Sequence, residues 1–517
     1  MAVIGIDLGT SNTCAAVVIN ESPQVILDEK GHSTLPSVMS ITRKGQFFIG
    51  HMAKAQLAVQ PERTVHSAKR LLGQHFSSDN VQRLRPFLSY PITEMDDGMT
   101  GIILNDTVLT PTEISAAILK KVKALAENAL NTAIDQAVIS VPAHFNNLQR
   151  QETKRAAEIA GLTVNRLINE PTAAALAYGF GTQETHIIAV YDFGGGTFDI
   201  SVLEIGEGIY NVLATGGDTF LGGNDFTQAI ANWLFDRFES RYHHDLSKDL
   251  IAKQRVFDAA EFAKIQLSNV NAVPIKLVNI LPNVNPNIEI NETLTRSQFE
   301  SFCVPLIDRS LRICQNVFET AGLNKSDIDE IIMVGGMTKM PLIREKVRDW
   351  FGRAPNTSVN PDEAVGIGAA IQAMALDSKN DFVLLLDVIP LTLSIEASGG
   401  VCIPAIPKNT KVPHKTSRIF TTSRDNQESV IISIYQGESN HSAENTLLAT
   451  LELTGIRPAK RMEPRIEVTM RIDVSGILSV TAKDLDSQNS QTIQVVDMGI
   501  KSLGALNQGD IAEETGI

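Results

Sequence analysis

Residues 187–200 have the sequence IIAVYDFGGGTFDI, an apolar run that ends in Asp192 and is followed by three glycines, a threonine and Asp199. Glycines expose bare backbone N–H groups and tolerate positive φ, so such a turn can wrap a phosphate. Apolar alternation resumes after the turn, which predicts a β-hairpin. The stretch is neither a GxGxxG fingerprint nor a P-loop. Taken alone, it is most simply an ordinary glycine-rich β-turn.

The N-terminus repeats this pattern. Residues 3–18, VIGIDLGTSNTCAAVV, contain an apolar strand ending in Asp7, a glycine–threonine turn and a second apolar strand. Two such hairpins indicate a duplicated unit. If they face each other, they offer two N–H cradles and two carboxylates, which suits nucleotide phosphates. Because carboxylates repel phosphate, a divalent cation must lie between them, held through waters as Mg²⁺ prefers. A third strand–glycine junction, IIMVGGMTKMP, spans 331–341.

Length and charge restrict the class of protein. A chain of 517 residues is expected to form more than one domain. The net charge of −14 argues against a nucleic-acid or anionic-membrane partner. The N-terminus lacks the basic region of a signal peptide, and the apolar stretches are too short to span a bilayer. The four cysteines form neither CxxC nor a metal-ligand spacing, which favours a reduced, cytoplasmic compartment.

Hydrophobic periodicity divides the chain. Up to about residue 376, helical and strand patterns mix, as in an α/β domain. The segments with these patterns are a strand at 136–145 and helices at 114–130, 148–161, 169–180, 255–268 and 361–376. From Pro390 onward the apolar residues alternate with period two, and a hairpin turn is predicted at Ser475-Gly476, which indicates an all-β domain.

The segment VLLLDV at 383–388 lies between the two regions and is unusually apolar for a linker. Two interpretations remain open. It is either the first strand of the β domain, or a linker that docks reversibly in a hydrophobic groove.

Several ordered motifs together resemble the DnaK-type, seventy-kilodalton heat-shock chaperone family, from about residue 2 to about 497. The matching motifs are GIDLGTSNTCAAV, AKRLLG, AVISVPAHFNNLQRQETKRAAEIAGL, INEPTAAALAYG, DFGGGTFD, GGDTFLGGNDF, GGMTKMP, NPDEAVGIGAA and VLLLDVIPLTLSIE. The resemblance suggests a divergent bacterial-type member whose helical lid is missing or truncated. It implies an α/β actin-like, two-lobed and duplicated ATPase domain at 1–378, a hydrophobic linker at 379–389, an all-β sandwich for peptides at 390–500 and a lid stub at 501–517.

The implied function is an ATP-dependent chaperone that binds and releases extended hydrophobic segments of unfolded proteins. Slow ATP hydrolysis, stimulated by peptide and co-chaperone, would control the cycle. The implied cofactors are ATP or ADP and Mg²⁺, with K⁺ as a further candidate. A J-domain co-chaperone and a nucleotide-exchange factor are the implied partners, without nucleic acid or membrane.

The resemblance also assigns site residues. The catalytic set is Lys69, Glu170, Thr197 and Asp199, and Asp7 and Asp192 would hold Mg²⁺ through water. The nucleotide-binding set is Asp7, Gly9, Thr10, Ser11, Asn12, Gly194, Gly195, Gly196, Thr197, Glu261, Lys264, Ser268, Gly335, Gly336, Lys339 and Asp362. The peptide-binding set is Ile395, Ser398, Phe420, Ser423, Val430, Ile432 and Ile466. The interdomain set is Pro142, Arg150, Leu384, Leu385 and Asp387.

Plainer interpretations stand beside these assignments. Lys69 could be a solvated lysine on an amphipathic helix, and Glu170 a carboxylate favoured by a helix N-terminus. Glu261 and Lys264 could be an ordinary i,i+3 pair, and the apolar peptide-binding residues could be plain core.

The chain also departs from the family pattern. Lys339 stands where arginine is common, which predicts weaker nucleotide binding because lysine cannot stack on adenine. Ile367 stands where tyrosine is common, and Ser398 and Ser423 replace apolar residues that arch over the peptide, which predicts fast peptide release.

Two functions outside the chaperone class are possible for an actin-like ATPase. A small-molecule kinase of the actin-like superfamily would leave the β domain unexplained. A nucleotide-binding scaffold without turnover would not need Lys69, Glu170 and Asp199.

Overall fold

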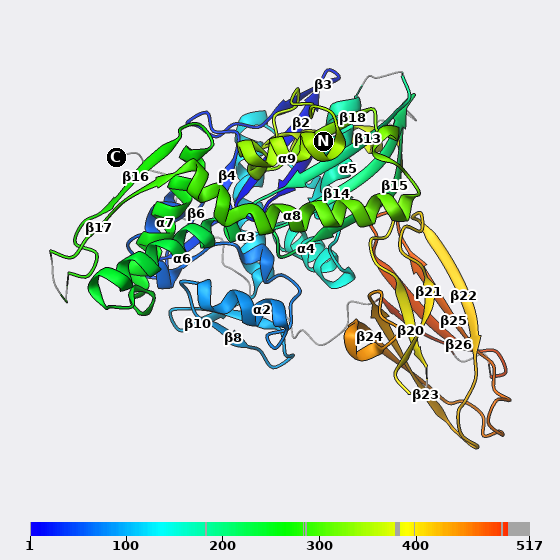
Figure 1. Ribbon diagram of the computed structural model, residues 1–517. Coiled ribbons are helices and arrows are strands. Elements are labelled where there is room, and N and C mark those ends of the chain that lie inside the picture. The colour runs from blue at the N-terminus through cyan, green and yellow to red at the C-terminus, as the bar shows by residue number, and fades with distance from the viewer. Residues whose placement is uncertain are drawn as a thin grey trace.

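The computed structural model describes residues 2–180, 184–282, 284, 287–377, 383–397, 399–487 and 490–494. Figure 1 shows a large α/β part and an elongated β domain that projects from it. None of the helices in these ranges is long and apolar enough to cross a membrane. All four cysteines are buried and free.

Both predicted glycine hairpins form, and they occupy equivalent places in two sheets. The first sheet has the order β12-β11-β1-β2-β3, with β4 beside β2, and the second has the order β18-β13-β14-β15-β19. Their strands are β1 (Val3–Leu8), β2 (Asn12–Ile19), β3 (Ser22–Val25), β4 (Leu35–Pro36), β11 (Gln136–Val141), β12 (Thr163–Asn169), β13 (His186–Phe193), β14 (Phe198–Gly206), β15 (Ile209–Asp218), β18 (Glu330–Val334) and β19 (Leu384–Leu386).

The pairing pattern supports the predicted duplication. β1 runs antiparallel to β2 and parallel to β11. In the same way, β13 runs antiparallel to β14 and parallel to β18. Asp7 and Asp192 each lie at the end of the first strand of their hairpin, so the repeated topology brings the two acidic turns to corresponding edges.

Helices cover both sheets (Figure 1). The helices in the described ranges are α1 (His51–Gln56), α2 (Asp79–Leu84), α3 (Pro111–Leu130), α4 (Asn147–Ile159), α5 (Glu170–Gly179), α6 (Gly223–Tyr242), α7 (Leu250–Leu267), α8 (Arg296–Ala321), α9 (Pro341–Phe351) and α10 (Ala364–Asp377). Local signals explain several starts: Asn146 and Gln149 form a capping box at α4, and Pro171 occupies the first turn of α5. The five helices predicted at 114–130, 148–161, 169–180, 255–268 and 361–376 form, with boundaries shifted by a few residues.

Three smaller sheets complete the α/β part, with the orders β6-β5-β7, β10-β9-β8 and β16-β17. Their strands are β5 (Met39–Ile41), β6 (Phe47–Ile49), β7 (Thr64–Val65), β8 (Ile92–Glu94), β9 (Thr100–Leu104), β10 (Thr107–Leu109), β16 (Ala272–Leu277) and β17 (Ile290–Thr295).

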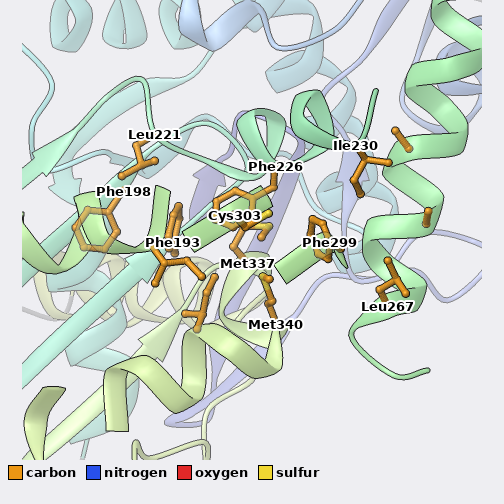
Figure 2. Packing of buried hydrophobic residues seen from close by; sticks show 14 of the residues in the cluster. Phe193, Phe198, Leu221, Phe226, Ile230, Leu267, Phe299, Cys303, Met337 and Met340 are labelled. Atoms are coloured by element: carbon orange, nitrogen blue, oxygen red, sulfur yellow. The ribbon is translucent and has the colours of Figure 1, made fainter. Parts of the chain in front are cut away.

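The core of the second lobe lies directly beneath the glycine turn. Phe193 and Phe198 flank the turn, and their rings pack at 5.2 Å between centroids. Phe226 on α6 contacts Phe193 at 5.4 Å. Figure 2 shows these rings with Met337 and Met340, which follow β18. The buried aromatic cluster therefore fixes the strand ends from which the polar turn emerges.

The apolar segment after α10 joins the ATPase sheet. β19 pairs in parallel with β15, with Leu385 opposite Tyr210. Leu385 is 6% exposed and packs in the core between the lobes, whereas Leu384 is 50% exposed. The segment is therefore not a strand of the β domain here but is docked on the ATPase sheet, as the second interpretation expects, and only one of the two predicted leucines is buried. That the docking is reversible stays a prediction. Residues 378–382 lie outside the described part of the chain.

The β domain is a sandwich of two four-stranded sheets, as the period-two alternation predicts. The sheets have the orders β21-β20-β23-β24 and β22-β25-β26-β27. The strands are β20 (Leu393–Ala397), β21 (Val401–Ile406), β22 (His414–Phe420), β23 (Ser429–Gln436), β24 (Thr446–Thr454), β25 (Ile466–Ile472), β26 (Leu478–Asp484) and β27 (Ser490–Gln494). The predicted hairpin at Ser475-Gly476 joins β25 to β26. The predicted lid stub at 501–517 lies outside the described residues.

Candidate nucleotide-binding cleft

A cavity of about 770 Å³ lies between the lobes and is lined by both acidic turns. This volume is within the range of small-molecule sites, about 300–1,000 Å³. The predicted residues that line it are Asp7, Gly9, Thr10, Ser11, Asn12, Lys69, Glu170, Asp192, Gly194, Gly195, Thr197, Glu261, Lys264, Ser268, Gly335, Gly336, Lys339 and Asp362. Gly196 and Asp199 are not among the lining residues.

The glycines are required by close approach of the two turns. A Cβ on Gly195 would lie 2.2 Å from the Ser11 hydroxyl oxygen, and one on Gly196 would lie 2.7 Å from the Thr10 side chain. Positive φ, which the sequence suggested as their purpose, does not occur at these positions but does occur at Gly335 (φ +81°). The turns therefore face each other with bare backbone, which leaves a cradle that any side chain would fill.

Lys69 lies in this cleft as a buried partner of Glu170. Its ammonium nitrogen is 2.7 Å from Glu170 Oε1, and the residue is only 6% exposed. The expected amphipathic helix is a single 3₁₀ turn, Ala68–Arg70, entered through Ser67 in the left-handed region. The interpretation of Lys69 as a solvated lysine is therefore wrong. Glu170 begins α5, so the helix N-terminus and the ion pair act on the same carboxylate.

Three further carboxylates surround this pair. Burial, reinforced by the charge of Glu170, raises the pKa of Asp7 to about 7 and that of Asp199 to about 8. The same causes hold the pKa of Asp192 well above its ordinary value. One lysine does not balance four acidic groups, and a cation between Asp7 and Asp192 would favour their charged forms. The donor set, carboxylate oxygens beside open space for water, fits Mg²⁺.

Another wall of the cleft carries two paired cations. Lys264 on α7 lies 2.7 Å from Glu261 and donates to the Gly223 carbonyl at 3.1 Å. Lys339 pairs with Asp362. Glu261 and Lys264 thus do form an i,i+3 ion pair, and both residues also line the cleft.

Arg344 is a lining residue that the sequence analysis missed. It lies in the first turn of α9, and its Nε donates to the Thr338 carbonyl at 2.7 Å. The signal was available, because α9 starts at Pro341 immediately after the GGMTKMP motif and its first turn must border the same wall. An arginine is therefore present on this wall although Lys339 replaces the one that the family pattern predicts.

A chain of hydrogen bonds leaves the cleft near Asp199. Its Oδ1 accepts from the His144 backbone N–H at 3.1 Å, and Pro142 accepts from Phe145 N in the same loop. Arg150 donates to the Ala143 carbonyl at 3.0 Å and to Asn169 Oδ1 at 2.7 Å. The described contacts thus place both predicted signalling residues, Pro142 and Arg150, in one loop–helix unit beside the cleft.

The same unit contacts the linker and the β domain. Asn169, which directly precedes Glu170, donates to Asp387 Oδ1 at 2.9 Å. The Ser475 hydroxyl accepts from Leu167 N at 3.1 Å, and Asn147 Oδ1 accepts from Leu478 N at 2.8 Å. The hairpin turn of the sandwich is therefore docked on α4 and β12 of the ATPase part.

The peptide-binding set gathers in the sandwich. Ile395, Ile432 and Ile466 are buried, whereas Phe420 and Val430 are half-buried against the same core. These burials suit core positions equally well, so a peptide-binding role stays a prediction. Ser423 is exposed and its N–H donates to Gln427 Oε1 at 3.1 Å. Ser398 lies outside the described residues, so the predicted arch is not seen.

The comparison with protein families covers almost the whole chain. The family model described as Hsp70 protein matches residues 3–511, which includes both lobes of the cleft, the docked strand and the sandwich. Hsp70 proteins are ATP-dependent, peptide-binding chaperones with an α/β nucleotide-binding part followed by a β-sheet substrate-binding part. With that match and the arrangement described above, the chain belongs to the Hsp70 family.

Proposed function

We propose that this ATPase hydrolyses ATP in the cleft around the Lys69–Glu170 pair, and that the Arg150–Asn169–Asp387 contacts couple hydrolysis to the β domain. The observation that carries the proposal is the buried ion pair at 2.7 Å between two facing glycine turns. Single-turnover phosphate release from Mg²⁺–ATP tests it, because turnover requires both the cleft and the pair.

In this mechanism the chain supplies positioning and charge rather than a covalent group. Backbone N–H groups of the turns at Gly9–Asn12 and Gly194–Thr197 would cradle the phosphates. Lys69 would orient the attacking water and stabilise the charge that develops on the transferred phosphoryl group, and Glu170 would hold Lys69 in place. Asp199, held by the His144 N–H, would order the same water.

Asp7 and Asp192 would hold Mg²⁺ through its water ligands, and Ser140, which donates to Asp7 at 2.9 Å, would orient the first carboxylate. Mg²⁺, when bound, supplies neutralisation of the phosphate charge. The finer assignment of K⁺ as a second cation rests on the family pattern and on the excess of carboxylates over lysine in the cleft.

Coupling would run through residues that are adjacent in sequence. Because Asn169 precedes Glu170, a shift of Glu170 on ATP hydrolysis would move the amide that holds Asp387. Release of Asp387 would free β19 from β15, and the β domain would leave α4. We assign the docked arrangement to the ATP-bound state, in which peptide exchange is fast, and expect a J-domain co-chaperone and an exchange factor to act on this cycle.

Arg344 gives a first prediction about nucleotide recognition. We expect Arg344→Ala to weaken ADP binding by about three- to tenfold, the scale of one stacking or cation–π contact. Pyrophosphate affinity should not change, since Arg344 belongs to neither phosphate turn and its Nε donates to the Thr338 carbonyl. Calorimetric titration with both ligands measures this difference.

Arg348→Ala provides the matched control, because Arg348 lies one turn further along α9, is exposed and pairs with Asp349. Equal losses for ADP and pyrophosphate in the Arg344 variant, or no loss for either, would remove Arg344 from the base side of the cleft.

A further inference from the structure

Three side chains of the first lobe bring one carboxylate and two imidazoles together outside the nucleotide cleft. The ligand atoms of Asp28, His32 and His51 all lie within 4.8 Å of one another. Asp28 Oδ2 is 2.8 Å from His32 Nδ1 and 3.9 Å from His51 Nε2. We propose that these residues form a binding site for a divalent transition-metal ion of the Zn²⁺ class.

The carboxylate is held by its own turn. Its Oδ1 accepts from the backbone N–H groups of Lys30 at 2.9 Å and His32 at 2.8 Å. The Asp28 N–H in turn donates to the His32 carbonyl at 3.0 Å. Because Oδ1 is occupied by backbone donors, Oδ2 is left directed toward the two imidazoles. One donor of the site is therefore fixed before any ion binds, which reduces the entropy lost on binding.

His51 approaches from a different segment. It is the first residue of α1, and the Gly50 before it has φ +76°, with its N–H bonded to the Val38 carbonyl at 3.0 Å. Its Nε2 is shielded from solvent, and no hydrogen-bond partner for it occurs in the described ranges. A buried nitrogen without a partner is costly, and a metal ion would satisfy it.

The two rings of the site are neighbours. The His32 and His51 rings lie 4.3 Å apart between centroids, at 33°. Each ring carries one of the nitrogen atoms that lie within 4.8 Å of the other ligand atoms of the site.

Donor type and spacing select the class of ion. Zn–N and Zn–O bonds of about 2.0–2.2 Å in a tetrahedron place ligand atoms roughly 3.3 Å apart, and the two contacts to Asp28 bracket this value. Two imidazoles and one carboxylate suit Zn²⁺ and its transition-metal neighbours, whereas Mg²⁺ prefers oxygen ligands. The positive charge of Lys54 on α1 acts on His51 and would repel a bound cation. A water would complete the fourth position.

Competition of the nucleotide-free, full-length chain with a chromophoric chelator for Zn²⁺ measures the site. We expect one tightly bound equivalent in the unmodified chain, and an affinity at least about tenfold lower in His32→Gln/His51→Gln, since loss of ligands should exceed the tenfold that outer-shell changes cost. The matched control is His243→Gln/His244→Gln, which removes two adjacent exposed histidines beyond α6. It should bind as the unmodified chain does.

Co²⁺ substitution adds a readout that does not depend on variants. Bound Co²⁺ should show the intense visible d–d absorption of a four-coordinate site with nitrogen ligands, and Asp28→Asn should weaken it. Zinc affinity unchanged in the His32/His51 variant, loss of binding in the His243/His244 control, or octahedral Co²⁺ spectra in the unmodified chain would each overturn the assignment.

Discussion

Lys69→Ala should lower single-turnover ATP hydrolysis by about two orders of magnitude or more while ATP still binds. This is the scale expected for loss of one group positioned to stabilise charge in the transition state. Among the residues that the structure describes, Glu170 forms an ion pair only with Lys69, so no other cation is in place to take over its role. Rapid quench with radiolabelled ATP measures the rate, and equilibrium binding of a fluorescent nucleotide measures affinity.

Two controls separate catalysis from stability. Removing Lys69 alone leaves Glu170 buried and unpaired, which costs about 3–5 kcal/mol in comparable pairs. Lys69→Ala/Glu170→Gln removes that orphan charge, so stability should recover while hydrolysis stays low. Lys44→Ala, on an exposed turn of the same lobe, should change neither the stability nor the rate of hydrolysis. Recovery of hydrolysis in the double variant would show that Lys69 acts only by neutralising Glu170.

Leu385→Asp should abolish the stimulation of ATP hydrolysis by peptide. Docking of β19 would then bury an aspartate in the core between the lobes, and such burial costs several kcal/mol or forces undocking. The basal rate should persist, because Leu385 does not line the cleft. The ratio of hydrolysis rates with and without an extended apolar peptide measures the effect.

Leu384→Asp is the matched control, since Leu384 precedes Leu385 on the same strand and is 50% exposed. Its stimulation ratio should stay close to that of the unmodified chain. Peptide binding by the Leu385→Asp chain should survive, because the sandwich core is separate. Equal behaviour of the two variants would mean that docking of β19 does not couple the domains.

Much of the fold could be predicted because its signals are local. The two Asp–Gly turns, the five helices with clear apolar periodicity and the period-two alternation each depend on residues within one hairpin or helix, and these elements form as predicted. The helix expected around Lys69 is instead a 3₁₀ turn. The pairing of β19 with β15 could not be derived in this way. An apolar run such as VLLLDV fits any hydrophobic edge, so its partner is decided by tertiary contacts with Tyr210 and the core around Leu385.

The site was predicted less completely, for three physical reasons. The buried position of Lys69 depends on its ion pair with Glu170, which lies 101 residues further along the chain, so no local sequence pattern predicts it. The role of the glycines depends on the opposite turn, so close approach rather than positive φ explains Gly195 and Gly196. Arg344 reaches the cleft because α9 begins at Pro341, the last residue of the GGMTKMP motif. The domain boundaries and individual residue roles stay predictions.

Family membership favours a chaperone over the two alternatives, and the docked sandwich gives the β domain a place in the cycle that neither a kinase nor a scaffold would need. The linker, the loop after Pro142 and the hairpin turn at Ser475 meet around Arg150, whose guanidinium contacts all three regions directly or through Asn169.

The most direct test of the central claim is single-turnover phosphate release from Mg²⁺–ATP by the unmodified chain, with and without an extended apolar peptide. The account predicts slow release that requires Mg²⁺ and rises when peptide is present, with ADP and inorganic phosphate as the products. Release that is unaffected by peptide, or transfer of the phosphoryl group to a small molecule instead of water, would contradict it.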